Sequence, residues 1–116
     1  MQWQELNDIN QLNELVSNSF DQPVLIFKHS TRCSISSMAL DRLERAWQPS
    51  EMEALSPWFL DLIAHRDISN KVAELFKVEH QSPQVLLIKN GDVTYHTSHM
   101  GIGYGQVKDA LSQVLS

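Results

Sequence analysis

The sequence predicts a single α/β domain over residues 1–116, with a central mixed sheet of four strands flanked by helices. Two observations predict this class. Short apolar runs rich in β-branched residues alternate with segments whose apolar residues recur every three to four positions. Two strand–helix–strand units are then followed by a hairpin and a last helix, an order that places helices on both faces of the sheet.

Four helices are predicted from apolar stripes. The first is capped by Asn7 or Asp8, the second ends before Pro49, and the third opens at Asp67 or Ser69. In chain order, the stripes are Ile9, Leu12, Leu15 and Val16; Ile35, Met38, Ala39, Leu43, Ala46 and Trp47; Ile68, Val72, Leu75 and Phe76; and Val107, Leu111, Val114 and Leu115.

Four strands are predicted between these helices. Residues 24–27 and 85–88 are almost wholly apolar, as expected for strands buried on both faces, and residues 58–63 form a further run. Asn90 and Gly91 form a strong hairpin signal, and residues 93–97 alternate as the returning strand. This order of elements is that of the thioredoxin-like fold with one extra N-terminal helix.

Composition and charge narrow the class of protein. No apolar run approaches the roughly 18 residues of a membrane span, and the first residues lack the pattern of a secretory signal. We therefore expect a soluble, cytoplasmic protein without a membrane partner. The net charge of −5 argues against nucleic acid as the main partner. One cysteine excludes an internal disulfide and a multi-cysteine zinc site.

That cysteine, Cys33, lies where the first buried strand leads into the second helix. Free N–H groups and the positive end of the helix dipole favour a thiolate at such a place. Arg32 is adjacent, and Lys28 and His29 add positive charge in an otherwise acidic protein. The surroundings are therefore those of a reactive thiol, with His29 as a candidate modulator of its ionisation.

Ser36 occupies the position of the second cysteine of a C-x-x-C pair. With no other cysteine in the chain, Cys33 needs a resolving thiol from outside. The Ser36 hydroxyl is one helical turn along and is predicted to donate a hydrogen bond to the Cys33 sulfur, which would favour the thiolate. The chemistry predicted for this chain is therefore monothiol.

The alternative for a lone cysteine is core packing, because free cysteine is among the most buried residue types. The flanking residues argue against it. Ser30 or Thr31 is predicted near the helix cap, and Ser34 follows the cysteine, so that its neighbours are polar. A reactive thiol is the better interpretation of Cys33.

Residues 27–36, FKHSTRCSIS, resemble the active-site segment of the YtxJ-like, monothiol bacilliredoxin family of thioredoxin-like proteins. The resemblance extends through residues 37–40, 66–70 and 80–84 and covers nearly the whole chain. It implies a domain that exchanges disulfides with bacillithiol, a low-molecular-weight thiol, and that has no tightly bound cofactor. The family often has proline directly after the reactive cysteine, where this chain has Ser34 and so keeps an N–H available to the sulfur.

Ser82 and Pro83 precede the third predicted strand, where the thioredoxin-like fold has a cis-proline that faces the active cysteine. By that match, the backbone at Ser82 aligns a substrate disulfide beside the cysteine. Together with Thr31 and Ser34, these two residues are the predicted substrate-binding residues.

The predicted function is a monothiol thiol–disulfide oxidoreductase. Cys33 attacks a mixed disulfide between a small thiol and a client protein, and Arg32 and Ser36 support the thiolate. A second small thiol or a partner disulfide reductase then removes the adduct. Two alternatives stay open: a non-catalytic module that binds peptides beside Ser82 and Pro83, and a redox sensor whose cysteine is capped once by a small thiol.

Other signals are weaker. No pair of the five histidines has the i, i+4 spacing of a zinc-binding helix, so no metal site is predicted and most are expected at the surface. Residues 101–106 imitate a dinucleotide-binding motif but lack its third glycine, and are interpreted as a turn before the last helix. Trp47 and Trp58 are predicted in the core, and Trp3 as a lid over the first helix.

Overall fold

Strands and helices follow one another in the predicted order. The computed structural model describes residues 1–115 and confirms each predicted helix and strand; the strand predicted at residues 58–63 begins and ends two residues earlier. The elements are β1 (Gln4–Glu5), α1 (Asn10–Asn18), β2 (Val24–His29), α2 (Ser34–Ala46), β3 (Ser56–Asp61), α3 (Arg66–Phe76), β4 (Gln84–Lys89), β5 (Asp92–Ser98) and α4 (Tyr104–Leu115), with short 3-10 helices η1 (Pro49–Glu51) and η2 (His99–Gly101).

The sheet has the strand order β1-β3-β2-β4-β5. Strand β2 lies at its centre, parallel to β3 and antiparallel to β4, and all six of its residues are buried. The α/β class and the mixed sheet are thus confirmed, but the prediction of four strands was wrong by one. Strand β1 has two residues, both polar and exposed, so it carries no apolar pattern and is recognisable only by its pairing with β3.

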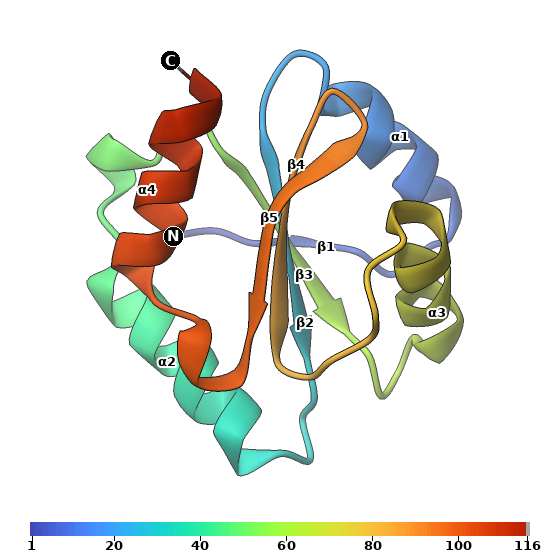
Figure 1. Cartoon of the computed structure of the whole chain (residues 1–116). Coiled ribbons are helices and arrows are strands. Elements are labelled where there is room, and N and C mark those ends of the chain that lie inside the picture. Colours follow the sequence, from blue (N-terminus) through green and yellow to red (C-terminus); the bar gives the residue numbers. More distant parts are fainter. Residues whose placement is uncertain (116) are drawn as a thin grey trace.

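Helices cover both faces of the sheet. Figure 1 shows α1 and α3 on one side of the strands and α2 and α4 on the other. Alternate residues of β2 serve the two cores: Leu25 and Phe27 pack toward α2 and α4, whereas Val24 and Ile26 pack toward α1 and α3. Among the described helices, none combines the length and apolar character needed to cross a membrane.

The apolar stripe that predicted α2 is buried only in part. Ile35 is 48% exposed and Met38 is 63% exposed, whereas Ala39 and Leu43 are buried. The first turn of α2 extends past the ends of the strands (Figure 1), so the sheet offers it no surface to cover. The other stripes are likewise exposed at their ends, at Ile9, Leu75 and Leu115, and Ala46 is exposed near the end of α2.

Trp3 was predicted to lie over the first helix, and this was wrong. Its ring packs edge-on against Phe27 and beside Trp47, and its Nε1 donates to Glu44 Oε2 at 2.8 Å. The unpredicted strand β1 carries the N-terminal segment along the edge of the sheet and brings Trp3 to the α2 side. Trp47 and Trp58 are buried, as predicted.

Two helix starts differ slightly from the prediction. Helix α1 begins at Asn10, whose N–H donates to Asp8 Oδ1 at 2.9 Å. Helix α3 begins at Arg66, so Asp67 and Ser69 lie inside its first turn and do not cap it. Such shifts are small and leave the packing faces of both helices unchanged.

Lys28 places an ammonium group in the interior of the fold. The residue is fully buried, and its Nζ donates to the Ser69 carbonyl oxygen at 3.1 Å and lies 3.4 Å from His80 Nδ1. Neither of these partners carries a negative charge. Burial lowers the pKa of Lys28 from 10.5 to about 8. The ammonium therefore lowers the stability of the fold at neutral pH.

We predict that Lys28→Met raises the free energy of unfolding at neutral pH by about 1–3 kcal/mol, because methionine removes an uncompensated buried charge. In the wild type, the pKa of Lys28 is lower in the folded than in the unfolded chain, so stability rises with pH between about 8 and 10.5. The difference between variant and wild type should therefore shrink across this window. Urea unfolding at both ends of the window measures it; a constant difference would contradict the assignment.

Candidate active site around Cys33

Cys33 is the N-cap residue of α2. Its backbone is extended, with φ −114° and ψ 118°, its N–H donates to the Ser30 carbonyl oxygen at 3.2 Å, and its own carbonyl accepts from Ser37 N at 3.1 Å. The cap was predicted at Ser30 or Thr31. The N-cap is instead Cys33, because residues 30–33 form a turn in which the Ser30 carbonyl accepts from Cys33 N. The free, half-buried cysteine thus lies at the N-terminus of α2, where the first N–H groups have no partner within the helix, and its side chain makes no capping hydrogen bond.

Ser36 connects the end of β2 to the start of α2. Its side chain is fully buried, its Oγ accepts from Ser30 N at 3.0 Å, and the same Oγ lies 2.7 Å from His29 Nδ1. The residue therefore holds the chain on both sides of the turn that carries Cys33. The predicted donation from Ser36 to the Cys33 sulfur stays a prediction.

His29 is the one histidine that is buried rather than at the surface. Its ring lies 6.2 Å from that of Phe27 and 5.4 Å from that of Phe59, measured between centroids. Burial lowers the pKa of His29 below its ordinary value, while the carboxylates of Asp61 and Glu44 act in the opposite direction. The sequence indicated His29 only by its nearness to Cys33 along the chain; its contact with the resolving position is a finding of the structure.

The peptide bond between Ser82 and Pro83 is cis, as predicted, and it leads into β4, the antiparallel neighbour of β2. The Pro83 carbonyl accepts from His99 N at 3.0 Å, and His99 has a left-handed φ of 53°. On the other side of η2, Arg42 donates from Nε and Nη2 to the Ile102 carbonyl at 3.2 and 2.8 Å. Helix η2 is thereby fixed between the cis-proline loop and α2.

An apolar rim borders the start of α2. It consists of Ile35 and Met38 on α2 and Met100 on η2, which packs beside α2; Met100 is 80% exposed. Exposed Arg32, next to the cysteine, adds a positive charge. Sequence reasoning placed the first two in the apolar stripe of the predicted helix and did not single out Met100. Their exposure follows from where α2 begins relative to the sheet. The predicted binding residues Thr31 and Ser34 are also exposed here.

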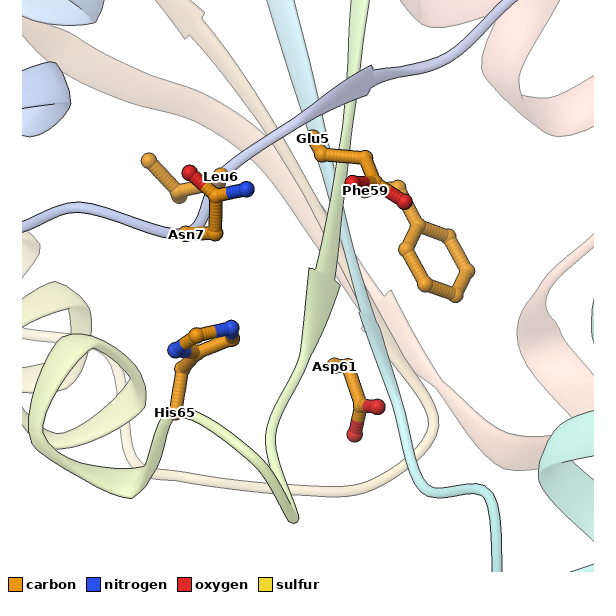
Figure 2. A pocket seen from close by; sticks show the side chains of 6 residues that line it. All are labelled: Glu5, Leu6, Asn7, Phe59, Asp61 and His65. Atoms are coloured by element: carbon orange, nitrogen blue, oxygen red, sulfur yellow. The ribbon is translucent and has the colours of Figure 1, made fainter.

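A pocket of about 140 Å³ lies elsewhere, at the β1 edge of the sheet. Figure 2 shows Asn7 and His65 on one side of strand β3 and the Phe59 ring on the other. The carboxylate of Asp61, also in its lining, accepts hydrogen bonds from the next turn, from Ile63 N at 3.1 Å. Cys33 does not line this pocket, so it is not part of the thiol site.

Comparison with known proteins agrees with this geometry. A family model described as monothiol bacilliredoxin BrxC matches residues 4–107. Among solved structures, an oxidoreductase with a thioredoxin fold is 26% identical, with 92% of this chain and 91% of that chain covered and a TM-score of 0.79.

Thioredoxins share the fold at lower identity. The thioredoxin of Malassezia sympodialis is 16% identical, with 97% of this chain and 90% of that one covered and a TM-score of 0.75. For that of Trypanosoma brucei brucei the identity is 14%, the coverage 98% and 91%, and the TM-score 0.76. The thioredoxin-like fold predicted from the order of elements is confirmed.

We predict that Ser36→Ala lowers the free energy of unfolding by about 1–3 kcal/mol, because it leaves the buried Ser30 N–H without an acceptor. Ser37→Ala is the matched control: that residue is exposed, and its backbone bond to Cys33 survives the substitution, so the change should stay within about 0.5 kcal/mol. Urea unfolding followed by tryptophan fluorescence measures both. Equal stability of the two variants would show that the Ser36 hydroxyl does not hold the turn.

Proposed function

The chain belongs to the monothiol bacilliredoxin BrxC family and is a thiol–disulfide oxidoreductase, and we propose that it removes bacillithiol, or a similar small thiol, from mixed disulfides on client proteins. One observation carries the proposal. The single cysteine caps α2, and Ser36 stands where a second cysteine would resolve an adduct. The resolving thiol must then come from another molecule.

The proposed reaction has two exchange steps. In the first, the Cys33 thiolate attacks the small-thiol sulfur of the client's mixed disulfide; that S–S bond breaks, and the client cysteine leaves as a thiolate that takes a proton from water. In the second, another small-thiol thiolate attacks the adduct on Cys33 and releases the Cys33 thiolate. Per cycle, the client's mixed disulfide and one free small thiol are converted into the client thiol and the disulfide of the two small-thiol molecules.

Several groups at the start of α2 support the thiolate in this proposal. The N–H groups of the first turn, including that of Ser34, and the positive end of the helix dipole favour negative charge on the sulfur. Arg32 adds a full positive charge beside it. A stabilised thiolate is above all a good leaving group, which suits a cysteine that must be regenerated in every cycle.

The client chain is proposed to lie across the cis-proline loop and the apolar rim. The backbone at Ser82, before cis-Pro83, aligns the client disulfide, and Thr31 and Ser34 border the sulfur. Bacillithiol enters as a co-substrate rather than as a resident cofactor, and a partner disulfide reductase is an alternative acceptor of the adduct. A cytoplasmic setting, in which thiols are kept reduced, belongs to the same proposal.

The apolar rim also favours a second candidate function, a peptide-binding module in which Cys33 takes no part. A third, the stoichiometric sensor, needs the cysteine but no turnover. The substitution Cys33→Ser distinguishes the binding module from the enzyme, because only the enzyme needs the thiol. The number of exchange cycles that the wild type completes distinguishes the sensor from the enzyme.

We predict that Cys33→Ser abolishes exchange. Wild-type protein mixed with a bacillithiolated client should gain the mass of one small thiol on Cys33, and with excess free thiol it should release many client thiols per molecule. The variant should do neither, because a hydroxyl is no nucleophile toward sulfur at neutral pH. Mass spectrometry and a client-thiol titration measure the two results.

The alternatives have distinct outcomes in the same experiment. Retained client capture by Cys33→Ser, without any adduct on the wild type, identifies the binding module. An adduct on the wild type that forms once and does not turn over identifies the sensor. Either result would overturn the proposed function.

We predict that Ile35→Gln raises the KM for a protein client about 5- to 10-fold by removing an apolar contact of the rim, and leaves kcat with a small-molecule disulfide unchanged. Leu75→Gln is the matched control, because Leu75 is similarly exposed, at 45% against 48%, but lies on α3. Steady-state kinetics with both substrates test the prediction. Equal effects of the two substitutions would exclude the rim as the client surface.

A further inference from the structure

A polar cluster lies on the α3 side of the sheet, next to residues 79–82. At its centre is the ammonium of Lys28 on β2, which is fully buried. Its Nζ donates to the Ser69 carbonyl oxygen on α3 at 3.1 Å and lies 3.4 Å from His80 Nδ1. The hydroxyl of Ser69 also lies 3.4 Å from that ring nitrogen. The side chain of His80 thus connects residues 79–82 to the central strand and to α3.

Few other contacts hold residues 79–82 in place. The Glu79 carbonyl accepts from Gln84 Nε2 at 3.0 Å, which fixes the backbone at one end of the segment. The Ser82 hydroxyl is buried but has no hydrogen-bond partner within the described part of the chain. Within this segment, His80 is therefore the residue whose own side chain is hydrogen-bonded to other elements of the fold.

The charge of Lys28 decides how the His80 ring can face it. An ammonium has three protons to donate and no lone pair, so His80 Nδ1 can only accept, and the ring proton of the neutral imidazole lies on Nε2. Burial lowers the pKa of His80 from its ordinary value of 6.5. The charged groups that act on the ring, Lys28 on β2 and Arg66 on α3, are both positive and lower this pKa further. At neutral pH the ring is therefore neutral, as the contact requires.

Stability alone does not explain the buried ammonium of Lys28. Its partners are neutral, so the fold bears the cost of burying a charge without an opposite charge to offset it. Natural proteins depart from the rules of stable packing above all at functional sites. An apolar side chain at this position would cost less, but it would have no proton to donate to His80. The contact between Lys28 and His80 is what the charge provides.

We propose that Lys28 and His80 position residues 79–82 for the client, and that a proton on His80 Nδ1 releases this segment. The inference rests on the proposed function, in which the backbone at Ser82 aligns the client disulfide. A protonated Nδ1 has no lone pair for the ammonium and faces it with like charge, so the contact breaks and the exposed ring turns to solvent. Both are positioning residues, because they act through the segment and not on the sulfur of Cys33.

Lys28→Met separates positioning from structural support. The variant should be more stable than the wild type, because it removes the buried charge, and yet its KM for a protein client should rise about 3- to 10-fold, because methionine cannot donate to His80. Its kcat with a small-molecule disulfide should stay the same, since that substrate does not need residues 79–82. A residue that served stability alone would not weaken client binding while making the protein more stable. An unchanged client KM would overturn the inference.

The pH profile isolates the proton on His80. In the wild type, the ratio of the client KM to the KM for a small-molecule disulfide should rise about 3- to 10-fold between about pH 7.5 and 5, because the lowered pKa of His80 places its protonation below 6.5. His80→Gln keeps an acceptor for Lys28 but does not titrate, so its ratio should match the wild type at neutral pH and stay constant in acid. His96→Gln is the matched control: this exposed histidine lies on β5, and its ring has no hydrogen-bond partner among the residues described, so the profile should be that of the wild type. A rise in acid that persists in His80→Gln would contradict the proposal.

Nitrogen NMR of the histidine ring tests the contact itself. In the wild type at neutral pH, His80 should carry its proton on Nε2, and it should titrate at a lower pH than in Lys28→Met, which lacks the ammonium. A proton on Nδ1, or equal titration in the two proteins, would refute the inference even if mixed-disulfide exchange succeeds. The expected tautomer and titration, together with no adduct from a bacillithiolated client, would instead refute the proposed function and leave the contact between Lys28 and His80 standing.

Discussion

The hydroxyl of Ser36 is the interaction on which the arrangement of the site depends. It lies inside the protein, accepts the Ser30 N–H and contacts the His29 ring, and so joins the central strand to the helix that begins at Cys33. A backbone N–H buried without an acceptor is costly, so the turn between them has little freedom. Together with the backbone bonds of Cys33 to Ser30 and Ser37, this contact holds the cysteine at the helix N-terminus.

The same contact explains how a chain of this fold works with one cysteine. Serine at the resolving position cannot form a disulfide, but it is a better hydrogen-bonding group than a thiol and has a place in the interior of the site. Ser36 thereby fixes the turn and contacts His29, but it cannot resolve an adduct on Cys33. A thiol from another molecule must then complete the cycle, and in the proposed function it is a small thiol that reaches Cys33 across the open surface that the first turn of α2 provides.

Much of the fold could be predicted because its strands and helices carry strong periodic patterns. The failures share a cause: they depend on where an element lies relative to its neighbours, which periodicity does not encode. Strand β1 is two exposed polar residues, and Trp3 follows it to the α2 side. The position of Cys33 near the start of a helix could be predicted from the sequence, and the cis peptide before Pro83 from the match to the thioredoxin-like fold. The His29–Ser36 contact was not, because it joins two elements through side chains seven residues apart.

Two adjacent residues of β2, Lys28 and His29, are both buried but have different surroundings. Lys28 and His29 point to opposite faces of the sheet, the first against Ser69 of α3 and the second against Ser36 of α2. Burial acts on both in the same direction, because it opposes a positive charge. Carboxylates lie near His29 alone, in Asp61 and Glu44, and they act against the effect of burial on its pKa, whereas burial is the one cause that acts on the pKa of Lys28. On the face of the sheet that carries Cys33, the buried polar side chain therefore has nearby groups that offset its burial, and on the opposite face the buried ammonium has neutral partners alone.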